Sequence, residues 1–383
     1  MKIGFSTTMI QRGKSGVAQY VFALLRALLA EGQEHCFHLF VLQDDLPLFE
    51  FAKDRAELVV VPERCRPALK NILWHQMQLP ALARRIGLDV LHIPSYRRLL
   101  WPKPCALVAT IHDLAPFHVS GKYDPARMFY GKVVVRRLAR RQDEIIAIST
   151  NTACDIERFF GIPRTRQHLV LNGIDHERFC PGDVTAAKVE AKERWNLTEP
   201  FFLYVSRLEH PAKNHVRLIE AFSRFKAKTG SQWQLVLGGG DWHGAEAIHA
   251  AAQASRVQQD IRFLGFVADA VLPTLYRAAD AFVYPSLFEG FGFPPIEAMA
   301  CGCPVISSAR GSLAEVVAQA AALVEPESAD DMAQQLQRMA TDEVWRAKLI
   351  AAGFQNARRF DWRTNARAVL EVYRAAAKRS RGA

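Results

Sequence analysis

The sequence predicts an α/β protein built from two doubly wound parallel sheets. Short β-rich runs alternate with amphipathic helical patterns over almost the whole chain, which is typical of parallel strands with helices on both faces. The 383 residues suit two domains, at roughly 100–200 residues per domain. Half of the residues are apolar and 23% are charged, which excludes a disordered chain, a small disulfide scaffold and a collagen-like fibre.

The alternation divides into two series of elements. In the first, the predicted strands are 3–7, 38–42, 58–61, 89–94, 106–112 and 144–149, and the predicted helices are 17–29, 71–86, 126–141 and 151–160. The second series has predicted strands at 201–206, 234–237, 261–266, 281–285 and 304–307. Its predicted helices are 216–228, 245–256, 271–278, 295–300 and 330–339.

The polar stretch 172–199, with a turn signal at Pro181-Gly182-Asp183, is the expected linker between the series. We therefore predict an N-terminal domain over 1–175 and a second domain over 176–360. The closing segment, 361–383, holds a last helix at 364–378.

Positive charge is concentrated in residues 64–141, which carry 15 Lys and Arg against three Asp and Glu. This region is net +12 and the whole chain is +10, so the remainder is −2. A localised basic region predicts an anionic partner, which is a lipid surface, a nucleic acid or a phosphorylated substrate.

The sequence also predicts where the protein is found. It begins without the layout of a signal peptide, and no run approaches about 18 apolar residues, so we expect no transmembrane helix. The seven cysteines form no Cys-x-x-Cys pair. We expect reduced thiols in a cytoplasmic protein.

Residues 288–302, FEGFGFPPIEAMACG, form the strongest site signal. They follow the predicted strand 281–285, and ligands of open α/β sheets bind at the carboxyl ends of strands. Pro294 and Pro295 suit the first turn of a helix, where a missing N–H costs nothing. A glycine-containing loop before a helix N-terminus would hold a phosphate.

Two carboxylates, Glu289 and Glu297, belong to this segment. Their spacing lets one face the sugar of a ligand while the other faces its ribose. The alternative for Glu297 is a helix N-terminal acid that the dipole favours. Two glutamates within a loop of glycines and aromatics favour a functional site.

At this segment the sequence resembles the GT-B glycosyltransferases, specifically the large retaining family 4, also called glycosyl transferases group 1. The family's landmarks occur in order along nearly the whole chain: the glycine loop 13–16, Thr110-Ile111-His112-Asp113, 148–151, 172–175, Ser206-Arg207-Leu208 with Lys213-Asn214, and Glu289 with Glu297. The resemblance implies two Rossmann-like domains facing across a cleft, with the C-terminal helix crossing back to the first. The first domain would bind the acceptor and the second the nucleotide sugar.

The resemblance implies that Arg207 and Lys213 hold the diphosphate of the donor. Both follow the predicted strand 201–206, and Arg neutralises a diphosphate as a bidentate donor whereas Lys does so as a point charge. A solvated charged loop is the alternative. The diphosphate-binding set is completed by Gly16 from the glycine loop, whose alternative is an ordinary strand-to-helix turn, and by Gly290, Phe291 and Gly292.

His112 ends the predicted strand 106–112 and precedes Asp113. A His–Asp pair suits a metal half-site, a general-base pair or a capped strand end. No second cluster has metal-ligand spacing and the chain contains no Asp-x-Asp, so we expect no bound metal and no cofactor. The resemblance implies that His112 touches the transferred sugar near the reaction centre.

These residues predict a hexosyltransferase that moves a sugar from a nucleoside diphosphate sugar to an acceptor hydroxyl with retention of anomeric configuration. Glu289 and His112 are the predicted catalytic residues and Glu297 the ribose ligand. GDP-mannose is the preferred donor, followed by a UDP-sugar. The expected acceptor is a glycan or a polyprenyl-diphosphate-linked intermediate of surface polysaccharide. The alternatives are a nucleotide-sugar epimerase or a phosphorylase of the same fold, or a basic nucleic-acid-binding protein.

The basic region 64–141 also carries aromatic residues, namely Trp74, Tyr96, Trp101, Phe129 and Tyr130. On a domain that binds a lipid-linked acceptor, such a surface would hold anionic headgroups at about 1 kcal/mol per well-placed cation. We therefore predict peripheral attachment to the inner face of the cell membrane. A generally solvated basic face is the alternative. Nucleic acid is not an expected partner, since no recognised nucleic-acid-binding module is present.

Overall fold

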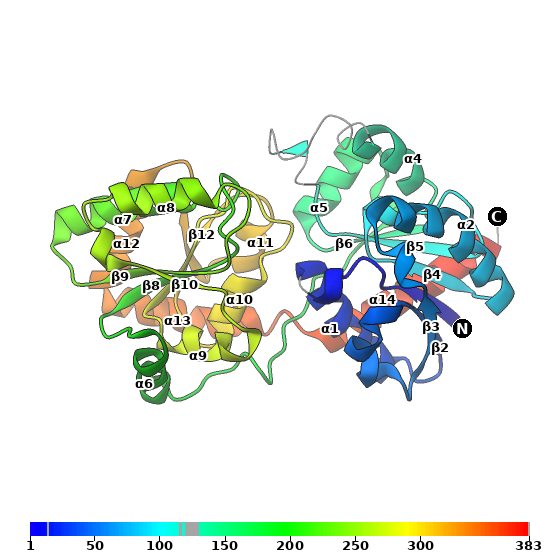
Figure 1. Cartoon of the computed structure of the whole chain (residues 1–383), viewed down its shortest axis with the longest axis horizontal. Coiled ribbons are helices and arrows are strands. Elements are labelled where there is room, and N and C mark those ends of the chain that lie inside the picture. Colours follow the sequence, from blue (N-terminus) through cyan, green and yellow to red (C-terminus); the bar gives the residue numbers. More distant parts are fainter. Residues whose placement is uncertain (14, 115–116, 119–129, 382–383) are drawn as a thin grey trace. The chain divides into compact units, whose positions relative to one another are not determined.

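The computed structural model describes residues 1–13, 15–114, 117–118 and 130–381. These residues form two units, drawn in Figure 1. Unit 1 comprises Met1–Gly173 and the chain from Phe360 onward, and unit 2 comprises Ile174–Arg359. The sequence analysis put the corresponding boundaries at 175/176 and 360/361. Each unit is a parallel sheet with helices, so the predicted α/β class is confirmed.

Unit 1 contains a seven-stranded sheet in the order β3-β2-β1-β4-β5-β6-β7, with every neighbouring pair parallel. The central strands are fully buried because helices cover both faces, which is why they read as continuous apolar runs. The strands are β1 (Lys2–Ser6), β2 (Cys36–Leu42), β3 (Ala56–Val61), β4 (Val90–Ile93), β5 (Ala106–Ile111), β6 (Glu144–Ala147) and β7 (Gln167–Leu169).

The helices of unit 1 cover its sheet in two groups. Helices α1 and α14 share one apolar core with the sheet, and α2, α4 and α5 share a second. The α-helices are α1 (Gly16–Glu31), α2 (Ala68–Ile86), α4 (Arg136–Ala139), α5 (Thr150–Asp155) and α14 (Trp362–Arg381). The 3₁₀ and π segments are η1 (Gln11–Gly13), η2 (Gln43–Ala52), η3 (Glu63–Cys65), η4 (Tyr96–Arg98), η6 (Tyr130–Val135), η7 (Ile156–Phe160) and η8 (Arg164–Arg166).

Unit 2 contains a six-stranded parallel sheet in the order β10-β9-β8-β11-β12-β13. Its largest fully buried side chains include Phe202, Phe222, Phe225 and Phe282, from both strands and helices. The strands are β8 (Phe201–Val205), β9 (Gln234–Gly238), β10 (Ile261–Gly265), β11 (Ala281–Tyr284), β12 (Val305–Ser308) and β13 (Ala321–Val324).

The helices of unit 2 alternate with these strands. They are α6 (Val184–Trp195), α7 (His215–Thr229), α8 (Ala245–Ala254), α9 (Leu272–Ala278), α10 (Phe293–Ala300), α11 (Leu313–Val317), α12 (Ala329–Thr341) and α13 (Glu343–Ala357). The short 3₁₀ turns η9 (Gln258–Asp260) and η10 (Asp269–Val271) precede β10 and α9.

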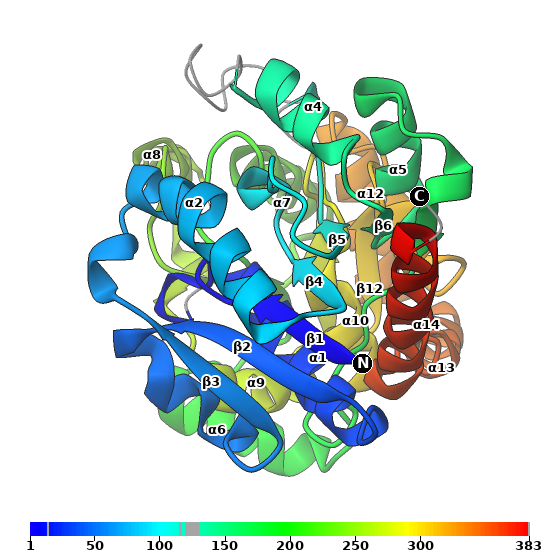
Figure 2. The same ribbon diagram turned by 90° about the vertical axis from the view of Figure 1, so that its right-hand side faces the viewer.

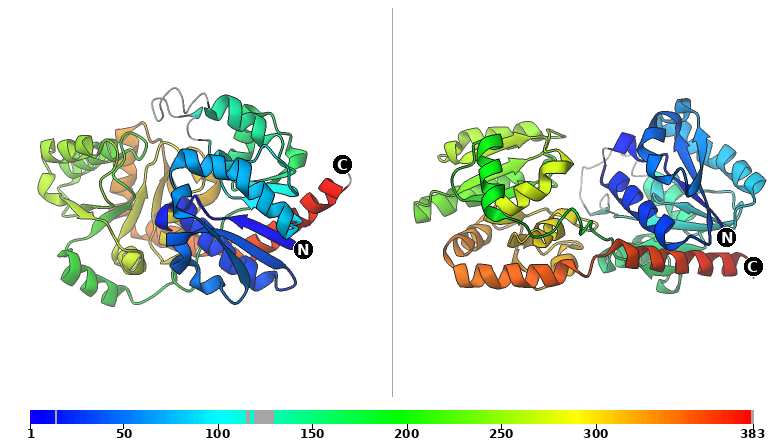
Figure 3. Two further views of the ribbon diagram at one scale, coloured as in Figure 1. Left: turned by 45° about the vertical axis from the view of Figure 1, so that its right-hand side comes forward. Right: turned by 90° about the horizontal axis from the view of Figure 1, so that it is seen from below.

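The C-terminal helix α14 belongs to unit 1, as the sequence analysis expected. Figures 2 and 3 show it (red) lying along that unit. Its Asn365 amide donates to the Leu171 carbonyl at 2.6 Å, and Arg379 pairs with the buried carboxylate of Glu144 at 2.7 Å. The chain thus returns to complete the unit in which it began.

The expected linker was partly wrong. The stretch 172–199 contains α6, whose first turn is capped by Asp183 accepting from the Ala186 N–H at 3.0 Å. Only Ala187 and Ala191 of this helix are buried, so it lacks the apolar stripe that predicts a helix. The expected helix over 126–141 is described only from Tyr130, as η6 and α4; residues 126–129, including Phe129, lie outside the described residues.

Both sheets share a topological feature that positions ligands. Strand order reverses direction between β1 and β4 in unit 1 and between β8 and β11 in unit 2. At such a switch point the two following loops diverge to opposite faces of the sheet and leave room at its carboxyl edge, where ligands of open α/β sheets bind.

Candidate active site

The switch point of unit 2 brings together two segments that are distant in the sequence. The loop after β8 carries Arg207 and Lys213, and the loop after β11 carries Glu289. The two loops are joined through the backbone, because the Leu287 N–H donates to the Ala212 carbonyl at 3.0 Å. The Asn214 amide donates to the Pro285 carbonyl at 3.0 Å, which holds them at a second point.

Lys213 and Glu289 form an ion pair where these loops meet. The Lys213 Nζ lies 2.6 Å from Glu289 Oε1, and the residues are 76 positions apart. The side chains are only 17% and 16% exposed. The Tyr284 hydroxyl, at the end of β11, donates to the same carboxylate oxygen at 3.0 Å. A largely desolvated cation and anion thus stand at the carboxyl edge of the sheet.

The pair fixes the charge of both groups. Burial alone would raise the pKa of Glu289, but the Lys213 charge and hydrogen bonds from Lys213, Ser286 and Tyr284 hold it below its ordinary value. Burial alone would lower the pKa of Lys213, and the Glu289 charge raises it above its ordinary value. Glu289 is therefore an anion and Lys213 a cation at neutral pH.

The loop containing Gly290, Phe291 and Gly292 is held in a defined shape. The Ser312 hydroxyl lies 2.9 Å from the Glu289 carbonyl and 3.0 Å from the Phe291 carbonyl, and donates to this pair of acceptors. Gly292 caps α10 with φ +103°, and a Cβ there would lie 2.5 Å from Leu313 Cδ2. Only glycine combines this backbone conformation with this close packing.

Arg207 lies apart from the Lys213–Glu289 pair. Its guanidinium is 3.3 Å from Glu209 Oε2 and stands 4.9 Å from the centre of the exposed Trp242 ring. Trp242 follows β9. Its backbone N–H donates to the Leu208 carbonyl at 3.1 Å, which joins this loop to the loop after β8. The structure therefore places Arg207 at the same sheet edge as Lys213, but with a different carboxylate partner.

Glu297 occupies a different environment from Glu289. It lies in α10 and accepts a hydrogen bond from the Tyr276 hydroxyl of α9 at 3.1 Å. Burial raises its pKa to about 7, and this effect outweighs the Tyr276 hydrogen bond and the charge of Arg178. This pKa is close to neutral pH, so the Glu297 carboxyl can take part both as a donor and as an acceptor.

His112 follows β5 in unit 1. Its Nε2 lies 3.1 Å from the Pro94 carbonyl, which requires Nε2 to carry the proton, and Pro94 follows the neighbouring strand β4. Its ring packs edge-on against Tyr20 at 4.6 Å. Burial lowers the pKa of His112. The ring is thus a neutral imidazole with Nδ1 as its acceptor nitrogen.

Gly16 is the first residue of α1, directly after the capping residue Ser15, whose Oγ accepts from the Ala18 N–H at 3.2 Å. A Cβ added at Gly16 would meet nothing within 4 Å. The open space fits the expectation that a ligand approaches the backbone there, although packing alone does not require glycine.

Several residues of the site were missed by sequence reasoning. Tyr284 and Tyr276, which bind Glu289 and Glu297, look like core aromatics in the sequence because both are almost fully buried. The His215 ring lies 4.5 Å from that of Tyr204 and is tilted to it, and burial lowers the pKa of His215 to about 3. No local pattern distinguishes such residues from ordinary core residues, because their roles depend on contacts across the fold.

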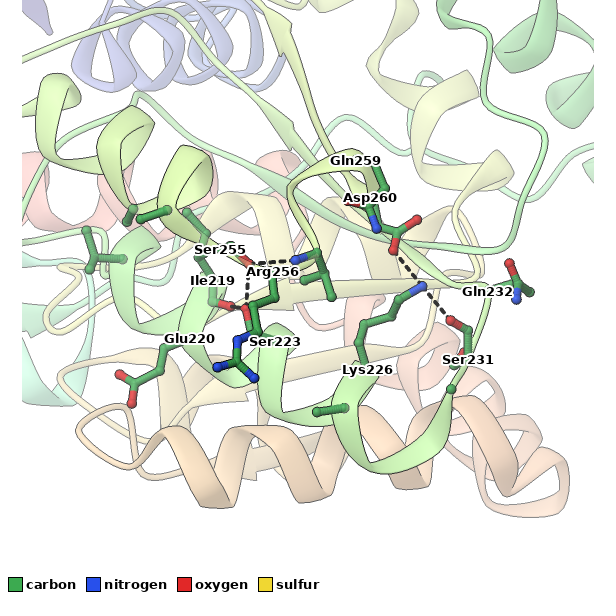
Figure 4. Close-up of a pocket in the computed structure, with 16 residues that line it drawn as sticks. Ile219, Glu220, Ser223, Lys226, Ser231, Gln232, Ser255, Arg256, Gln259 and Asp260 are labelled. Carbon is green, nitrogen blue, oxygen red and sulfur yellow. Dashed lines mark hydrogen bonds and ion pairs between the residues drawn. The ribbon is translucent and has the colours of Figure 1, made fainter.

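A groove of unit 2 lies at the opposite edge of its sheet, away from Lys213 and Glu289 (Figure 4). Its volume is about 890 Å³, and residues before β9 and β10 line part of it. Among the groups that line it, Lys226 pairs with Asp260 at 2.8 Å and Ser223 with Ser255 at 2.8 Å.

In the described part of the chain, no group of three or more His, Cys, Asp or Glu side chains is placed to share a metal.

Comparisons with known proteins agree with the fold. The family model "Glycosyltransferase Family 4" matches residues 14–178, and "Glycosyl transferases group 1" matches residues 186–356. O-antigen chain mannosyltransferase B of Escherichia coli is 27% identical over 98% of this chain and 100% of its own. The serotype-specific mannosyltransferase WbdA of Escherichia coli is 31% identical over 70% of this chain, which spans 33% of WbdA. Sucrose-phosphate synthase from Thermosynechococcus elongatus has a TM-score of 0.79 at 23% identity, covering 98% of each chain.

The two doubly wound units and the matched sequences together define an enzyme of the GT-B class of glycosyltransferases. Within that class, the chain belongs to glycosyltransferase family 4, the glycosyl transferases group 1. The predicted family and fold are confirmed. The individual site residues stay predictions.

Proposed function

We propose that the protein transfers mannose from GDP-mannose to a hydroxyl of a lipid-linked glycan, with retention of anomeric configuration, in surface polysaccharide synthesis. The observation that carries the transfer site is the desolvated Lys213–Glu289 pair at the switch point of unit 2. The choice of donor is supported by the similarity to O-antigen chain mannosyltransferase B over the full length of both chains.

In this proposal the donor diphosphate binds beside Lys213 and Arg207, at the loop formed by Gly290, Phe291 and Gly292. The bond between the anomeric carbon and the diphosphate oxygen breaks, and its electron pair goes to the diphosphate. Lys213, Arg207 and the positive end of α10 stabilise that charge. The mannose becomes cationic at its anomeric carbon, and the nearby Glu289 anion stabilises it while binding the sugar hydroxyls.

The acceptor oxygen then attacks from the face that the diphosphate is leaving, and the acceptor's proton passes to a diphosphate oxygen. Same-face attack gives retention without a covalent enzyme intermediate. His112 would contact the mannose through its neutral imidazole. Glu297 would hold the ribose hydroxyls, and its pKa of about 7 suits a group that exchanges hydrogen bonds with hydroxyls. Gly16 would allow the donor phosphates to approach the backbone.

We further propose that the reaction needs neither a bound metal nor a cofactor, since two cations are available for the diphosphate. A thermal-shift panel of GDP, GDP-mannose, UDP, UDP-glucose and ADP, with and without EDTA, tests donor and metal together. A ligand that binds only the folded state stabilises it by about 2.7 kcal/mol at 100 times its Kd. We expect GDP and GDP-mannose each to raise Tm. For each ligand the shift should be the same with and without EDTA.

A shift from UDP or ADP alone would overturn the choice of donor, and a shift abolished by EDTA would overturn metal independence. The variant Lys213→Met should lose the GDP shift. The matched variant Val344→Ser, at an exposed position on α13, should keep it. Retention is read from the anomeric proton of the product by NMR, and inversion would contradict same-face attack.

The acceptor side of the proposal is peripheral attachment to the inner face of the cell membrane through the basic region 64–141. Within the described residues, no helix is both long enough and apolar enough to cross a bilayer. The high positive charge of this region supports attraction to anionic lipids. Partition of GDP-mannose-dependent activity between membrane and supernatant fractions tests this attachment, and full activity in the supernatant at low salt contradicts it.

A further inference from the structure

The outer face of α2 exposes a row of large apolar side chains. Leu69, Leu73 and Met77 are 77%, 58% and 71% exposed. Their four-residue spacing places them on one face of the helix. The opposite face supplies Trp74 and Leu79 to the core of unit 1. The inner face of α2 therefore packs against the core of unit 1, and the outer row takes no part in that core.

One residue of the predicted basic and aromatic surface, Trp74, lies in the core instead. Trp74 was expected among the surface aromatics of the basic region, but it is buried against Phe40 at 6.1 Å between ring centres. The 3.6-residue period places Trp74 on the inner face and its neighbour Leu73 on the outer face. The exposed apolar side chains of α2 are the aliphatic Leu69, Leu73 and Met77. Composition alone does not distinguish such residues from residues of the core.

Trp101 adds an aromatic side chain next to α2. The backbone N–H of Trp101 donates to Gln76 Oε1 at 2.8 Å, and Gln76 Nε2 donates to the Leu99 carbonyl at 2.7 Å, so the segment is attached to the helix. Residue Trp101 is 55% exposed, and the Arg141 guanidinium stands 4.5 Å from its ring centre. Trp beside Arg is a combination that suits the boundary between lipid headgroups and acyl chains.

The charged residues of α2 itself all have one sign. The helix contains the cations Lys70, Arg84 and Arg85 and no acidic residue; Figure 2 shows where α2 lies on unit 1. All three are exposed, and within the described residues none of them has an ion-pair partner. Later in unit 1, η6 and α4 carry the further exposed cations Lys132, Arg136 and Arg137. The surface thus combines apolar side chains with uncompensated positive charge.

We propose that this face of α2 is the membrane-insertion surface of the protein. Leu69, Leu73 and Met77 enter the interfacial layer of an anionic bilayer, while Lys70, Arg84 and Arg85 contact its headgroups. This deepens the proposed function, on which it rests for the lipid-linked acceptor. An anionic bilayer fits both halves of the surface, since it offers negative headgroups above an apolar layer. A nucleic acid would satisfy the cations and leave the aliphatic row in water.

The two halves of the surface predict two components of binding. Electrostatic attraction weakens with salt because the Debye length is only about 8 Å at 0.15 M and shorter above it. Apolar insertion is insensitive to this screening. Binding to anionic vesicles should therefore fall with salt to a residual level and not to zero. That residual level should depend on the aliphatic row alone.

Flotation of the full chain with phosphatidylcholine vesicles, with and without 40% phosphatidylglycerol, tests the proposal. We expect the triple variant Leu69→Ser, Leu73→Ser, Met77→Ser to bind anionic vesicles at least tenfold more weakly and to lose the salt-resistant fraction. The variant Lys70→Gln, Arg84→Gln, Arg85→Gln should lose the salt-sensitive fraction. The control Val184→Ser, Val189→Ser, Val344→Ser removes three exposed apolar residues of unit 2 and should bind like the wild type.

Tryptophan quenching by lipids brominated on their acyl chains gives a second readout. Quenching should be strong for the wild type and reduced in Trp101→Phe. Wild-type binding by the serine triple variant, or a wild type that does not float at low salt, would overturn the proposal. So would salt-dependent binding of a single-stranded RNA without vesicle binding, which would favour the nucleic-acid alternative.

The GDP thermal shift of every variant separates this proposal from the proposed function. Vesicle binding without a thermal shift from any nucleotide of the panel would overturn the transferase proposal and leave the insertion surface standing. A normal GDP shift without vesicle binding would overturn the insertion surface and leave the transferase proposal standing.

Discussion

The two units share one strand topology and use its switch point differently. In unit 2 the loops at the switch point bring a cation and an anion together, at 2.6 Å between Lys213 Nζ and Glu289 Oε1. In unit 1 the candidate residues are a neutral imidazole bound to a backbone carbonyl and a glycine beside open space. A shared topology therefore fixes where a site lies, while the loop residues decide its chemistry.

The contrast recurs within unit 2, between two glutamates on one loop and helix. Glu289 is buried beside a cation, and its pKa lies below the ordinary value. Glu297 is buried beside a neutral tyrosine, and its pKa rises to about 7. Burial acts in the same direction on both, so the neighbouring charge decides the sign of the shift.

The largest effect is expected from separating Lys213 and Glu289. The variant Lys213→Met leaves the Glu289 charge buried without its partner, which should reduce the free energy of unfolding by about 4 kcal/mol. It should also reduce GDP release from GDP-mannose roughly 10³-fold, measured with a lipid extract as acceptor. Urea unfolding gives the stability.

The double variant Lys213→Met, Glu289→Gln is the control for this prediction. It removes both charges with little change in volume, so stability should return to within about 1 kcal/mol of the wild type while activity stays lost. If the double variant is as unstable as the single variant, the pair contributes through its shape and not through its charges.

The next largest effect is the pH dependence of stability that comes from Glu297, the second of the two glutamates. The raised pKa of Glu297 means that the folded state keeps its proton up to pH about 7, whereas the unfolded state loses it near 4.5. The wild-type stability contributed by this group is present below pH 4.5 and is lost as the pH rises to 7. This loss amounts to about 3 kcal/mol at most.

The variant Glu297→Gln lacks this titration. The free energy of unfolding of the variant should therefore rise relative to that of the wild type between pH 4.5 and 7.5. Urea unfolding of both proteins across this range measures the difference. Parallel curves for the two proteins would show that the Glu297 carboxyl is not shifted.

A smaller effect separates the glycines of the two units. The variant Gly292→Ala forces a Cβ to within 2.5 Å of Leu313 Cδ2 at φ +103°, and should cost about 2 kcal/mol of stability. The same change at Gly16 meets no atom and places alanine in a helix, so stability should stay equal or rise by about 0.5 kcal/mol.

If the donor phosphates lie against the backbone at Gly16, Gly16→Ala should nevertheless weaken GDP-mannose binding. Calorimetric titration and Tm of both variants check these expectations. Normal donor affinity in Gly16→Ala would return this residue to an ordinary strand-to-helix turn.

A small stability change is also expected at His112. His112→Gln keeps a neutral donor for the Pro94 carbonyl and should change stability by less than about 1 kcal/mol. Transfer should still fall roughly 100-fold, because the imidazole is proposed to contact the mannose. A variant with normal GDP release would confine His112 to a structural role in unit 1.

Much of this architecture was readable from the sequence because its causes are local. Apolar runs predicted the central strands, and amphipathic periods predicted helices such as α1 and α7. The edge strands β7 and β13 and the helices α6 and α13 were missed. The strands are short, at three and four residues, and the helices bury too few apolar residues to show a clear stripe.

Residue patterns along the chain were enough to give the α/β class, the two series of elements and the residues that could carry chemistry. Which of these residues meet depends on the folded arrangement. Lys213 and Glu289 become a pair because strand order places their loops side by side, whereas burial raises the pKa of Glu297 because no cation among the described residues forms a close ion pair with it. Residue type and spacing act along the chain, whereas pairing, burial and pKa depend on neighbours that folding brings from far along it.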